Sequence, residues 1–156
     1  MADVHDRVTR SRNMAAIRGV DTRPEMTIRK ALHARGFRYR LHAKGLPGKP
    51  DLILPKYTAA VFVHGCFWHG HDCPLFRWPK TREEFWRDKI GRNQTRDVDV
   101  RRQLGADGWR VAVVWECALK GRGRLPLAHV IDSLSVWLSS DAKELSIEGH
   151  LIDEST

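Results

Sequence analysis

Residues 61–73, VFVHGCFWHGHDC, constrain the fold of this chain more than any other stretch, because an apolar, β-branched run leads directly into a loop of cysteines and histidines. Short apolar runs bounded by turn residues are typical of buried strands. A second such run, WRVAVVWE at 109–116, is followed at once by Cys117. We expect both runs to lie in one sheet, with Cys117 placed to meet the loop.

The loop carries a C-x4-H-x-C pattern formed by Cys66, His71 and Cys73. Zinc favours four nitrogen or sulfur ligands in a tetrahedron, and Cys117 would supply the fourth from a strand end. This set uses every cysteine of the chain and leaves no position open for a substrate, so we expect a structural zinc site. The alternative is that Cys117 is an ordinary buried thiol and that the loop matches a zinc site only in part.

The rest of the pattern predicts one domain over residues 1–156, with an α/β or α+β fold in which helices flank a mixed sheet. A capping residue, an early proline and Glu25 predict a helix that starts at residues 21–25 and ends at Gly36. Further helices are expected at 81–108 and 126–138. Strands are expected at 37–43, at 109–116, and in a hairpin formed by 51–54 and 59–64.

The long helix predicted at 81–108 carries two specific expectations. The sequence TREE at its start has the form of a capping box, in which Glu84 would bond back to the Thr81 amide. Gly91 and Asn93 are expected to bend or interrupt the helix.

The charge balance favours a polyanionic partner. The formal net charge is +8, and residues 1–50 carry twelve Lys or Arg against four Asp or Glu. Residues 139–156 carry one Lys against five acids. A basic arm at about 1–20 and an acidic tail at about 140–156 suggest one side that faces nucleic acid. The alternative is an ordinary solvated surface, since many basic proteins bind no nucleic acid.

Cysteine usage and hydropathy indicate the compartment. Three cysteines make an odd number, and two of them lie beside histidines, which favours a reducing cytoplasm over a disulfide framework. The chain has no apolar run of about 18 residues and no apolar signal core in MADVHDRVTRSRNMAA. We therefore expect neither a membrane span nor secretion.

A candidate cation site lies at the predicted hairpin. Asp51 starts one strand and His64 ends the other, so antiparallel pairing would bring Asp51 close to residues 63–64. A carboxylate, a backbone carbonyl and water can hold a hard cation there. Such a cation can activate a water and neutralise charge on a phosphate.

Two further side chains could join this chemistry. Glu25 would add a second carboxylate, and a histidine such as His69 can move a proton near neutral pH. Each also has an ordinary interpretation when taken singly. Asp51 could cap a turn, Glu25 could complement a helix dipole, and His69 could be a simple loop histidine.

The layout around Asp51 is similar to the PD-(D/E)xK nuclease core, with Phe62-x-His64 in place of the usual acid-x-lysine, so a generic member of that superfamily is a poor match. A closer resemblance covers nearly the whole chain. It is to the very-short-patch repair (Vsr) endonucleases, which nick DNA at T:G mismatches. The matching segments are MADVHDR, TRSRNM, LPGKPD, HGCFWHGHDC, TREEFWRDKIGRN and GWRVAVVWECALKGR. Val63 departs from the family, since a threonine stands there in at least part of it.

The resemblance implies a restriction-endonuclease-like fold and a Mg²⁺-dependent nick on the 5′ side of the mispaired thymine, leaving a 5′-phosphate. Asp51 would be the central Mg²⁺ ligand, aided by the Val63 carbonyl. Glu25 and His64 would hold waters on the metal, and His69 would lie beside the scissile phosphate as a proton-transfer or phosphate-positioning group. The structural zinc ligands of the family match Cys66, His71, Cys73 and Cys117.

Large aromatic side chains crowd the same region. Phe67 and Trp68 lie inside the ligand-rich loop, and we expect Trp86 on the solvent side of the long helix because Phe85 and Ile90 take its apolar face. Apolar wedges inserted between base steps unstack DNA, and a mispaired step opens more easily. The alternative is that these rings pack around the zinc loop.

The resemblance matches Phe67, Trp68 and Trp86 to intercalating aromatics and Met14 to a wedge from the opposite groove. It also implies phosphate contacts by basic residues of the arm. These residues are Arg7, Arg10, Arg12 and Arg18. The three remaining tryptophans that follow the long helix, Trp109, Trp115 and Trp137, are assigned to the core.

The implied partner is double-stranded DNA with a T:G mismatch, in the bacterial cytoplasm at the nucleoid. From the chain size and the asymmetry of a single mismatch, we expect a monomer on DNA. The implied biological link is to a cytosine-5 methylase and the repair machinery. Three alternatives use the same residues differently. They are a sequence-specific restriction-type nuclease, a non-catalytic zinc-stabilised DNA-binding module, and a zinc hydrolase with histidine ligands.

Overall fold

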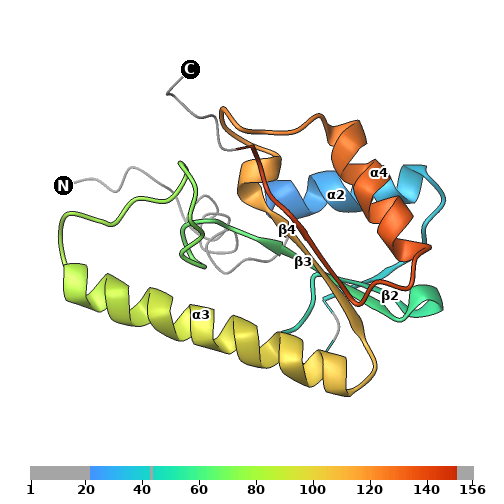
Figure 1. Ribbon diagram of the computed structural model, residues 1–156, viewed down its shortest axis with the longest axis horizontal. Helices are drawn as coiled ribbons and strands as arrows, with labels where there is room; N and C mark the ends of the chain where they lie inside the picture. Colours follow the sequence, from blue (N-terminus) through green and yellow to red (C-terminus); the bar gives the residue numbers. More distant parts are fainter. Residues whose placement is uncertain (1–21, 43, 151–156) are drawn as a thin grey trace, which may run out of the picture.

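One mixed sheet organises the chain. The computed structural model describes residues 22–42 and 44–150, whose strands form a five-stranded sheet in the order β1-β2-β3-β4-β5 (Figure 1). The helices are α2 (Arg23–Ala34), α3 (Glu83–Ala106) and α4 (Leu127–Leu138). The strands are β1 (Arg40–Leu41), β2 (Leu52–Leu54), β3 (Ala59–His64), β4 (Arg110–Trp115) and β5 (Glu144–Ile147). This is the mixed α+β fold that the sequence predicts.

The sheet changes direction at its central strand, β3. Strands β1, β2 and β3 pair antiparallel, whereas β4 and β5 continue from β3 in parallel. A short 3-10 turn, Pro55–Tyr57, joins β2 to β3. The predicted hairpin is therefore confirmed, and the strong apolar run at 109–116 forms β4 beside it.

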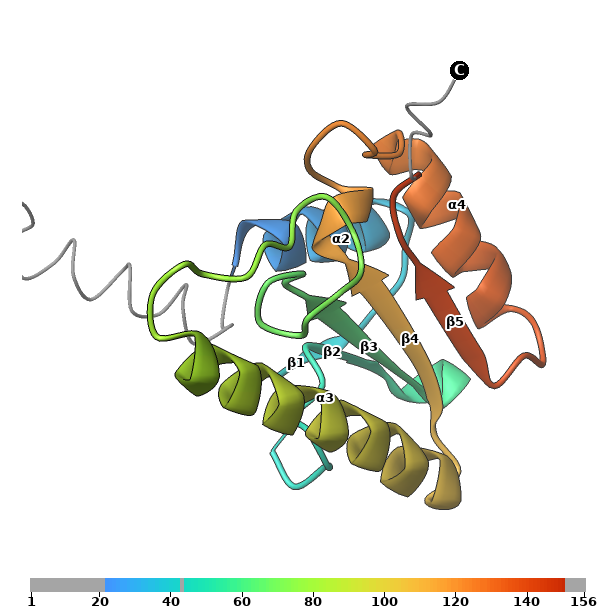
Figure 2. The ribbon, with the colours of Figure 1, turned by 60° about the vertical axis from the view of Figure 1, so that its left-hand side comes forward.

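Helices cover both faces of the sheet, with α2 and α4 on one side and α3 on the other (Figures 1 and 2). The larger apolar cluster joins Ile28 of α2 and Leu134 of α4 to Val61 of β3. The opposite cluster joins Leu104 of α3 to Phe62 of β3. Burial of each such side chain contributes about 1.5–3 kcal/mol. Because successive β3 residues serve opposite faces, this strand is an unbroken apolar run and not an alternating one.

Two helices agree with their predictions. Thr22 caps α2, since its Oγ1 accepts a hydrogen bond from the Glu25 amide at 3.3 Å. Gly36, just beyond this helix, adopts a φ of 92°, which an L side chain rarely tolerates. Helix α4 follows Pro126, as expected. Among the described residues, no helix has the length and apolar character needed to span a bilayer.

Both expectations for the long helix are wrong. Arg82 precedes the first turn in a left-handed conformation, with φ of 53°, and no side chain caps it, so the capping box at Thr81 does not form. The helix also runs without interruption through Gly91 and Asn93. Helix interiors tolerate a single glycine at a loss of about 1 kcal/mol relative to alanine. The Asn93 amide donates to the carbonyl of Trp68 at 2.9 Å, so it binds another segment and does not compete for its own backbone.

Strands at the sheet edges were the least predictable. Of the described residues in the strand expected at 37–43, only Arg40–Leu41 pairs with β2, and His42 then turns the backbone with a φ of 45°. Strand β5 was not predicted at all. It lies in the acidic C-terminal segment, and only Ile147 among its four residues is buried. A four-residue alternation of exposed and buried positions is too short to distinguish a strand from a loop in the sequence.

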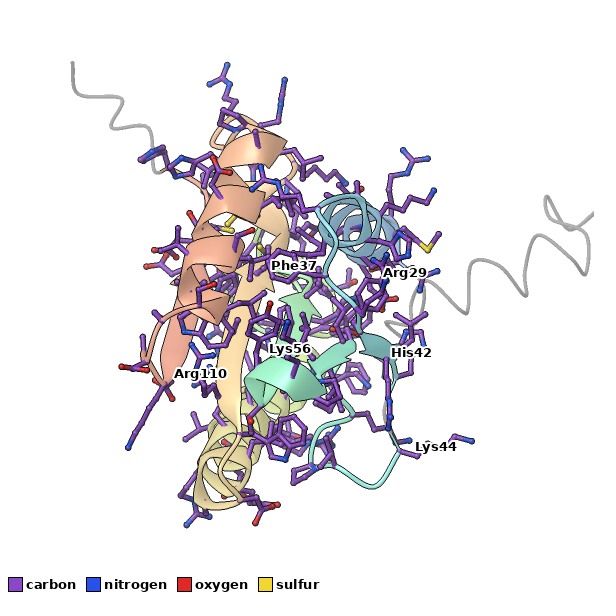
Figure 3. The ribbon with its side chains drawn as sticks, turned by 90° about the vertical axis from the view of Figure 1, so that its right-hand side faces the viewer. Arg29, Phe37, His42, Lys44, Lys56 and Arg110 are labelled. Atoms are coloured by element: carbon purple, nitrogen blue, oxygen red, sulfur yellow. The ribbon has the colours of Figure 1, made fainter. Side chains whose placement is uncertain are left out.

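Arg110 joins the start of β4 to the end of α4. Its guanidinium donates to the carbonyls of Trp137 at 2.5 Å and Leu138 at 3.2 Å, and it lies over the Trp137 ring at 4.4 Å. Further bonds reach the carbonyls of Tyr57 and Ala142. Figure 3 shows Arg110 beside α4. The last carbonyls of a helix have no intrahelical partner. Arg110 supplies a charged donor to two of them, and the Trp137 carbonyl also accepts from Ser140.

Replacing Arg110 with Met should lower the free energy of unfolding by about 2–3 kcal/mol, because several carbonyls lose a charged donor. Urea denaturation monitored by tryptophan fluorescence measures the change. The same substitution at Arg102, which is 75% exposed, serves as the control and should stay within about 0.5 kcal/mol of wild type. Equal effects at the two positions would contradict this role for Arg110.

Candidate functional site

A cleft of about 1570 Å³ opens where β3 and β4 end and β2 begins. These strand ends meet because β2 runs antiparallel to β3, whereas β4 runs parallel to it. Seven Lys or Arg and three Asp or Glu line the cleft, and such a surplus attracts polyanions. The basic lining residues are Arg23, Lys49, Lys89, Arg96, Arg101, Lys120 and Arg124.

Asp51 immediately precedes β2 and is hydrogen-bonded to β3. Its Oδ2 accepts a hydrogen bond from the Val63 amide at 2.7 Å, which confirms that antiparallel pairing brings the two together. Glu25 projects from the first turn of α2 and is only 1% exposed. His42 Nε2 lies 3.1 and 3.0 Å from the two Glu25 carboxylate oxygens. Asp51, Glu25 and His42 thus form one group that could hold a metal ion.

Burial sets the electrostatics of this group. It raises the pKa of Asp51 from 3.8 to about 8, the hydrogen bond from Val63 opposes the rise, and nearby Glu25 adds to it. Two carboxylates that share a buried site resist joint ionisation. A divalent cation would remove this penalty, so the arrangement is suited to binding one.

A second group lies on the other side of the β3 terminus. His64 is 8% exposed, and its ring stacks on that of His69 with centroids 3.8 Å apart and planes 6° apart. His69 Nδ1 lies 2.5 Å from a carboxylate oxygen of Asp97 on α3. Burial, followed by the proximity of His69, lowers the pKa of His64 to about 3. His64 is therefore neutral at physiological pH, and its Nδ1 has no partner within the described ranges.

The sequence analysis placed Asp51, Glu25, His64 and His69 in one site. The structure divides them between two neighbouring groups, and each group contains one residue that the sequence did not suggest. His42 was hidden in the overpredicted strand. Asp97 had a detectable signal, since it lies seven residues after buried Ile90 and seven before buried Leu104 on the same helical face. An acid among core-facing positions of a helix is a candidate functional residue.

The four predicted soft ligands do converge. Cys66, His71, Cys73 and Cys117 place one ligand atom each within 4.8 Å of all the others. His71 Nδ1 lies 3.7 Å from the Cys66 sulfur and 3.6 Å from the Cys117 sulfur. Burial raises the pKa of both of these thiols. Three sulfurs and one imidazole around one point are the donor set of a closed, tetrahedral site for a soft cation.

Outer contacts orient this donor set. The Cys117 amide donates to the Cys66 sulfur at 3.3 Å, and the Gly149 amide donates to the Cys117 sulfur at 3.3 Å. His71 Nε2 lies 2.8 Å from a carboxylate oxygen of Glu148, just after β5. A carboxylate on the far nitrogen fixes the ring tautomer and directs Nδ1 to the metal. Strand β5 is thereby linked to the loop.

Helix α3 binds the backbone of the Cys/His loop through two side-chain amides. Asn93 binds the Trp68 carbonyl, and Gln94 donates to the Gly70 carbonyl at 3.1 Å. Gly70 itself has a φ of 58°, and a Cβ there would lie 2.7 Å from Ile90 Cγ2. A larger residue would be strained at this φ and would have to displace the side chains of Gln94 and Ile90.

The ring of Trp115 lies between His71 of the four-donor cluster and the histidine pair His64–His69. Its ring stacks on His71 at 4.1 Å and presents an edge contact to His64 at 5.2 Å. It is half-buried and packs against the smaller apolar cluster, so its assignment to the core is confirmed in part. Trp109 is also half-buried, and Trp137 is a core residue at 4% exposure.

The aromatic residues form one cluster at the cleft. Phe67 is in edge contact with Trp68 at 5.2 Å and with Trp86 at 5.4 Å. The predicted orientation of the helix start was wrong, because Trp86 is half-buried in this cluster and Phe85 is 39% exposed. The rings thus pack on one another beside the loop, and Phe67 and Trp68 line the cleft. Met14, Arg7, Arg10, Arg12 and Arg18 lie outside the described residues.

Comparisons with known proteins place the chain among DNA-cleaving enzymes. The profile of the family described as DNA mismatch endonuclease Vsr matches residues 2–75. The chain is 44% identical over 148 residues to the DNA mismatch endonuclease Vsr of Escherichia coli (strain K12), covering 95% of each. It is 47% identical over 121 residues to the type II nicking enzyme V.XorIIP of Xanthomonas oryzae pv. oryzae, covering 76% of this chain and 89% of that enzyme. The type II nicking enzyme V.NmeAIP of Neisseria meningitidis serogroup A is 44% identical over 122 residues, covering 78% of this chain and 87% of its own.

Replacing Asp51 with Asn should stabilise the protein at alkaline pH in buffer without added divalent cation. The pKa of Asp51 is about 8 in the folded state and 3.8 when unperturbed. Between these values the folded state binds a proton that the unfolded state releases, so the stability of the wild type falls as pH rises. The variant lacks this titration.

Urea denaturation of the Asp51→Asn variant and wild type between about pH 6 and pH 8.5 tests the sign of this effect. The advantage of the variant should grow with pH. A difference that stays constant across the range, or a variant that is less stable at the upper end, would contradict the raised pKa.

Proposed function

Because this chain belongs to the Vsr family of DNA mismatch endonucleases, we propose that it nicks one strand of duplex DNA on the 5′ side of a thymine mispaired with guanine. The reaction leaves a 5′-phosphate from which repair synthesis can start. The observation that carries the catalytic part is half-buried Asp51, which lines a cleft with a basic lining, accepts from the Val63 amide, and lies close to buried Glu25. Mg²⁺ bound there would activate a water and neutralise charge on the phosphate.

Asp51 is the proposed central ligand, with the Val63 carbonyl as a second. In an extended strand the N–H and C=O of one residue point to the same side. Since the Val63 amide donates to Asp51, its carbonyl faces the same side of β3. Glu25 adds a second carboxylate to this group. The Thr-to-Val departure at position 63 leaves this role intact, because only the backbone takes part.

His69 is the proposed proton-transfer or phosphate-positioning group. Asp97 accepts a hydrogen bond from its Nδ1 side, which orients the ring and leaves Nε2 available to the substrate. His64 is held neutral by burial and stacks on His69. It can therefore accept a hydrogen bond from a water in the site without carrying a positive charge.

The aromatic cluster is the proposed mismatch reader. Phe67, Trp68 and Trp86 contact one another in the protein alone, and entering a base stack would exchange these contacts for contacts with bases. Unstacking one base step costs a few kcal/mol, and a mispaired step is the easiest to open. Met14 and the four arginines of the arm would add a second wedge and phosphate contacts.

The proposed substrate arises when 5-methylcytosine deaminates in duplex DNA, which links the enzyme to a cytosine-5 methylase and to repair machinery. One monomer on each mismatch fits the asymmetry of the lesion, with residues 1–156 acting as a single cytoplasmic domain. V.XorIIP and V.NmeAIP are named as nicking enzymes, which favours cutting of one strand over the double-strand cut of a restriction enzyme.

Labelled duplexes that carry T:G or T:A at one position test this function, with Mg²⁺ present or omitted. A single nick is expected only with T:G and Mg²⁺. Asp51→Ala should slow it by about a thousandfold or more, because metal assistance is worth several kcal/mol, while DNA binding is retained.

Two other outcomes of this assay would reject the proposal. Cutting of both strands of the T:A duplex would identify a restriction-type nuclease. Binding of the mismatch with no cleavage under any condition would identify a DNA-binding module.

The Cys3His cluster is the proposed structural zinc site. It uses no residue of the two cleft groups, and its four donors leave no open position. Zinc there would hold the loop that carries His69, Phe67 and Trp68, so its loss would disturb catalysis indirectly.

Replacing Glu148 with Gln should weaken zinc binding about tenfold, because His71 loses its charged outer partner. Competition with a chromogenic zinc chelator measures this affinity. Glu144→Gln, on the exposed side of the same strand, is the matched control and should leave it unchanged. If the two variants bind zinc equally well, Glu148 does not support the site.

A further inference from the structure

His42 occupies a position for which neither the zinc site nor the proposed chemistry accounts. It lies immediately after the short strand β1, and its amide donates to the Asp51 carbonyl at 3.1 Å. Its Nε2 lies within hydrogen-bond distance of both oxygens of Glu25. Arg29 also contacts Glu25, at 3.1 Å, and Figure 3 shows His42 and Arg29 on the same flank of the molecule.

The backbone at His42 is turned to reach this site. Its φ of 45° lies in the left-handed region, which is uncommon for residues with a side chain and tends to occur at functional positions. The turn ends the pairing of β1 and directs the imidazole to buried Glu25. An imidazole nitrogen and two carboxylate oxygens, one each from His42, Glu25 and Asp51, lie within 4.8 Å of one another.

We propose that His42 is a nitrogen ligand of the catalytic divalent cation, which shifts metal use from Mg²⁺ towards Mn²⁺ and Co²⁺. The proposal rests on the proposed function, in which Asp51 binds that cation. Carboxylates and carbonyls suit Mg²⁺, whereas imidazole favours later divalent metals. The site combines both ligand types. A site with Asp51, Glu25 and the Val63 carbonyl alone would offer oxygen only.

A simpler role for His42 makes a different prediction. If His42 only holds Glu25 in place through a hydrogen bond, its loss should weaken binding of every cation by the same factor. If it is a ligand, its loss should weaken Mn²⁺ binding much more than Mg²⁺ binding. The ratio between the two metals therefore separates ligation from positioning.

The first measurement is pulsed electron paramagnetic resonance (ESEEM) of Mn²⁺ bound to the full-length, zinc-loaded protein. Coordinated imidazole nitrogen modulates the Mn²⁺ signal. The modulation should be present in wild type and in His129→Gln, an exposed control on α4, and absent in His42→Ala. Nitrogen modulation that persists in His42→Ala would overturn the proposal.

The second measurement is the metal concentration that gives half-maximal nicking of a T:G duplex. His42→Ala should raise it about tenfold for Mn²⁺ and far less for Mg²⁺. His42→Gln should behave like the alanine variant, since an amide oxygen does not replace imidazole. Equal shifts for the two metals would reduce His42 to a positioning residue and overturn the proposal.

These two measurements also separate this inference from the proposed function. Nitrogen modulation that depends on both His42 and Asp51, in a protein that nicks no T:G duplex, would support the metal ligand and reject the mismatch activity. Mn²⁺ binding that does not depend on Asp51 would overturn both.

Discussion

The parallel pairing of β3 with β4 is the constraint on which the functional end of the molecule depends. Its register sets His64 opposite Trp115, so the two strands end at the same level. Cys66 and Cys117 each follow two residues later, and the Cys117 amide reaches the Cys66 sulfur. A slip of one residue would turn each side chain to the opposite face. It would break the four-donor cluster and the ring contacts of Trp115 with His64 and His71 together.

Burial gives the cleft its chemistry and also an electrostatic penalty. Asp51 and Glu25 are held in a site that disfavours joint ionisation, and His64 is held neutral. A cation would remove the first penalty, and the basic lining of the cleft is suited to a polyanion such as DNA. The Asp51–Glu25–His42 group is held by α2 and by the ends of β1 and β2, whereas α3 supplies both Asp97 and Trp86 to the His69–Asp97 pair and the aromatic cluster.

Much of the fold and part of the candidate site could be predicted from local sequence pattern. The β2–β3 hairpin, β4, α2 and α4 follow from apolar runs and capping residues, and Asp51 with the Cys3His set follows from residue type and spacing. The missed features depend on contacts between distant segments. His42 was assigned to a strand that its positive φ ends, the burial of Trp86 depends on the loop above it, and β5 is too short to show an alternation.

The sequence by itself determined the donor types, the apolar strands that carry them, and the family. Only the tertiary structure decided how those donors are divided, with Asp51 and Glu25 joined to His42, and with His64 and His69 joined to Asp97. The physical reason is that spacing along a chain limits which side chains can meet within one loop or helix turn. Partners that lie on different elements are selected by packing and register, which no local pattern encodes.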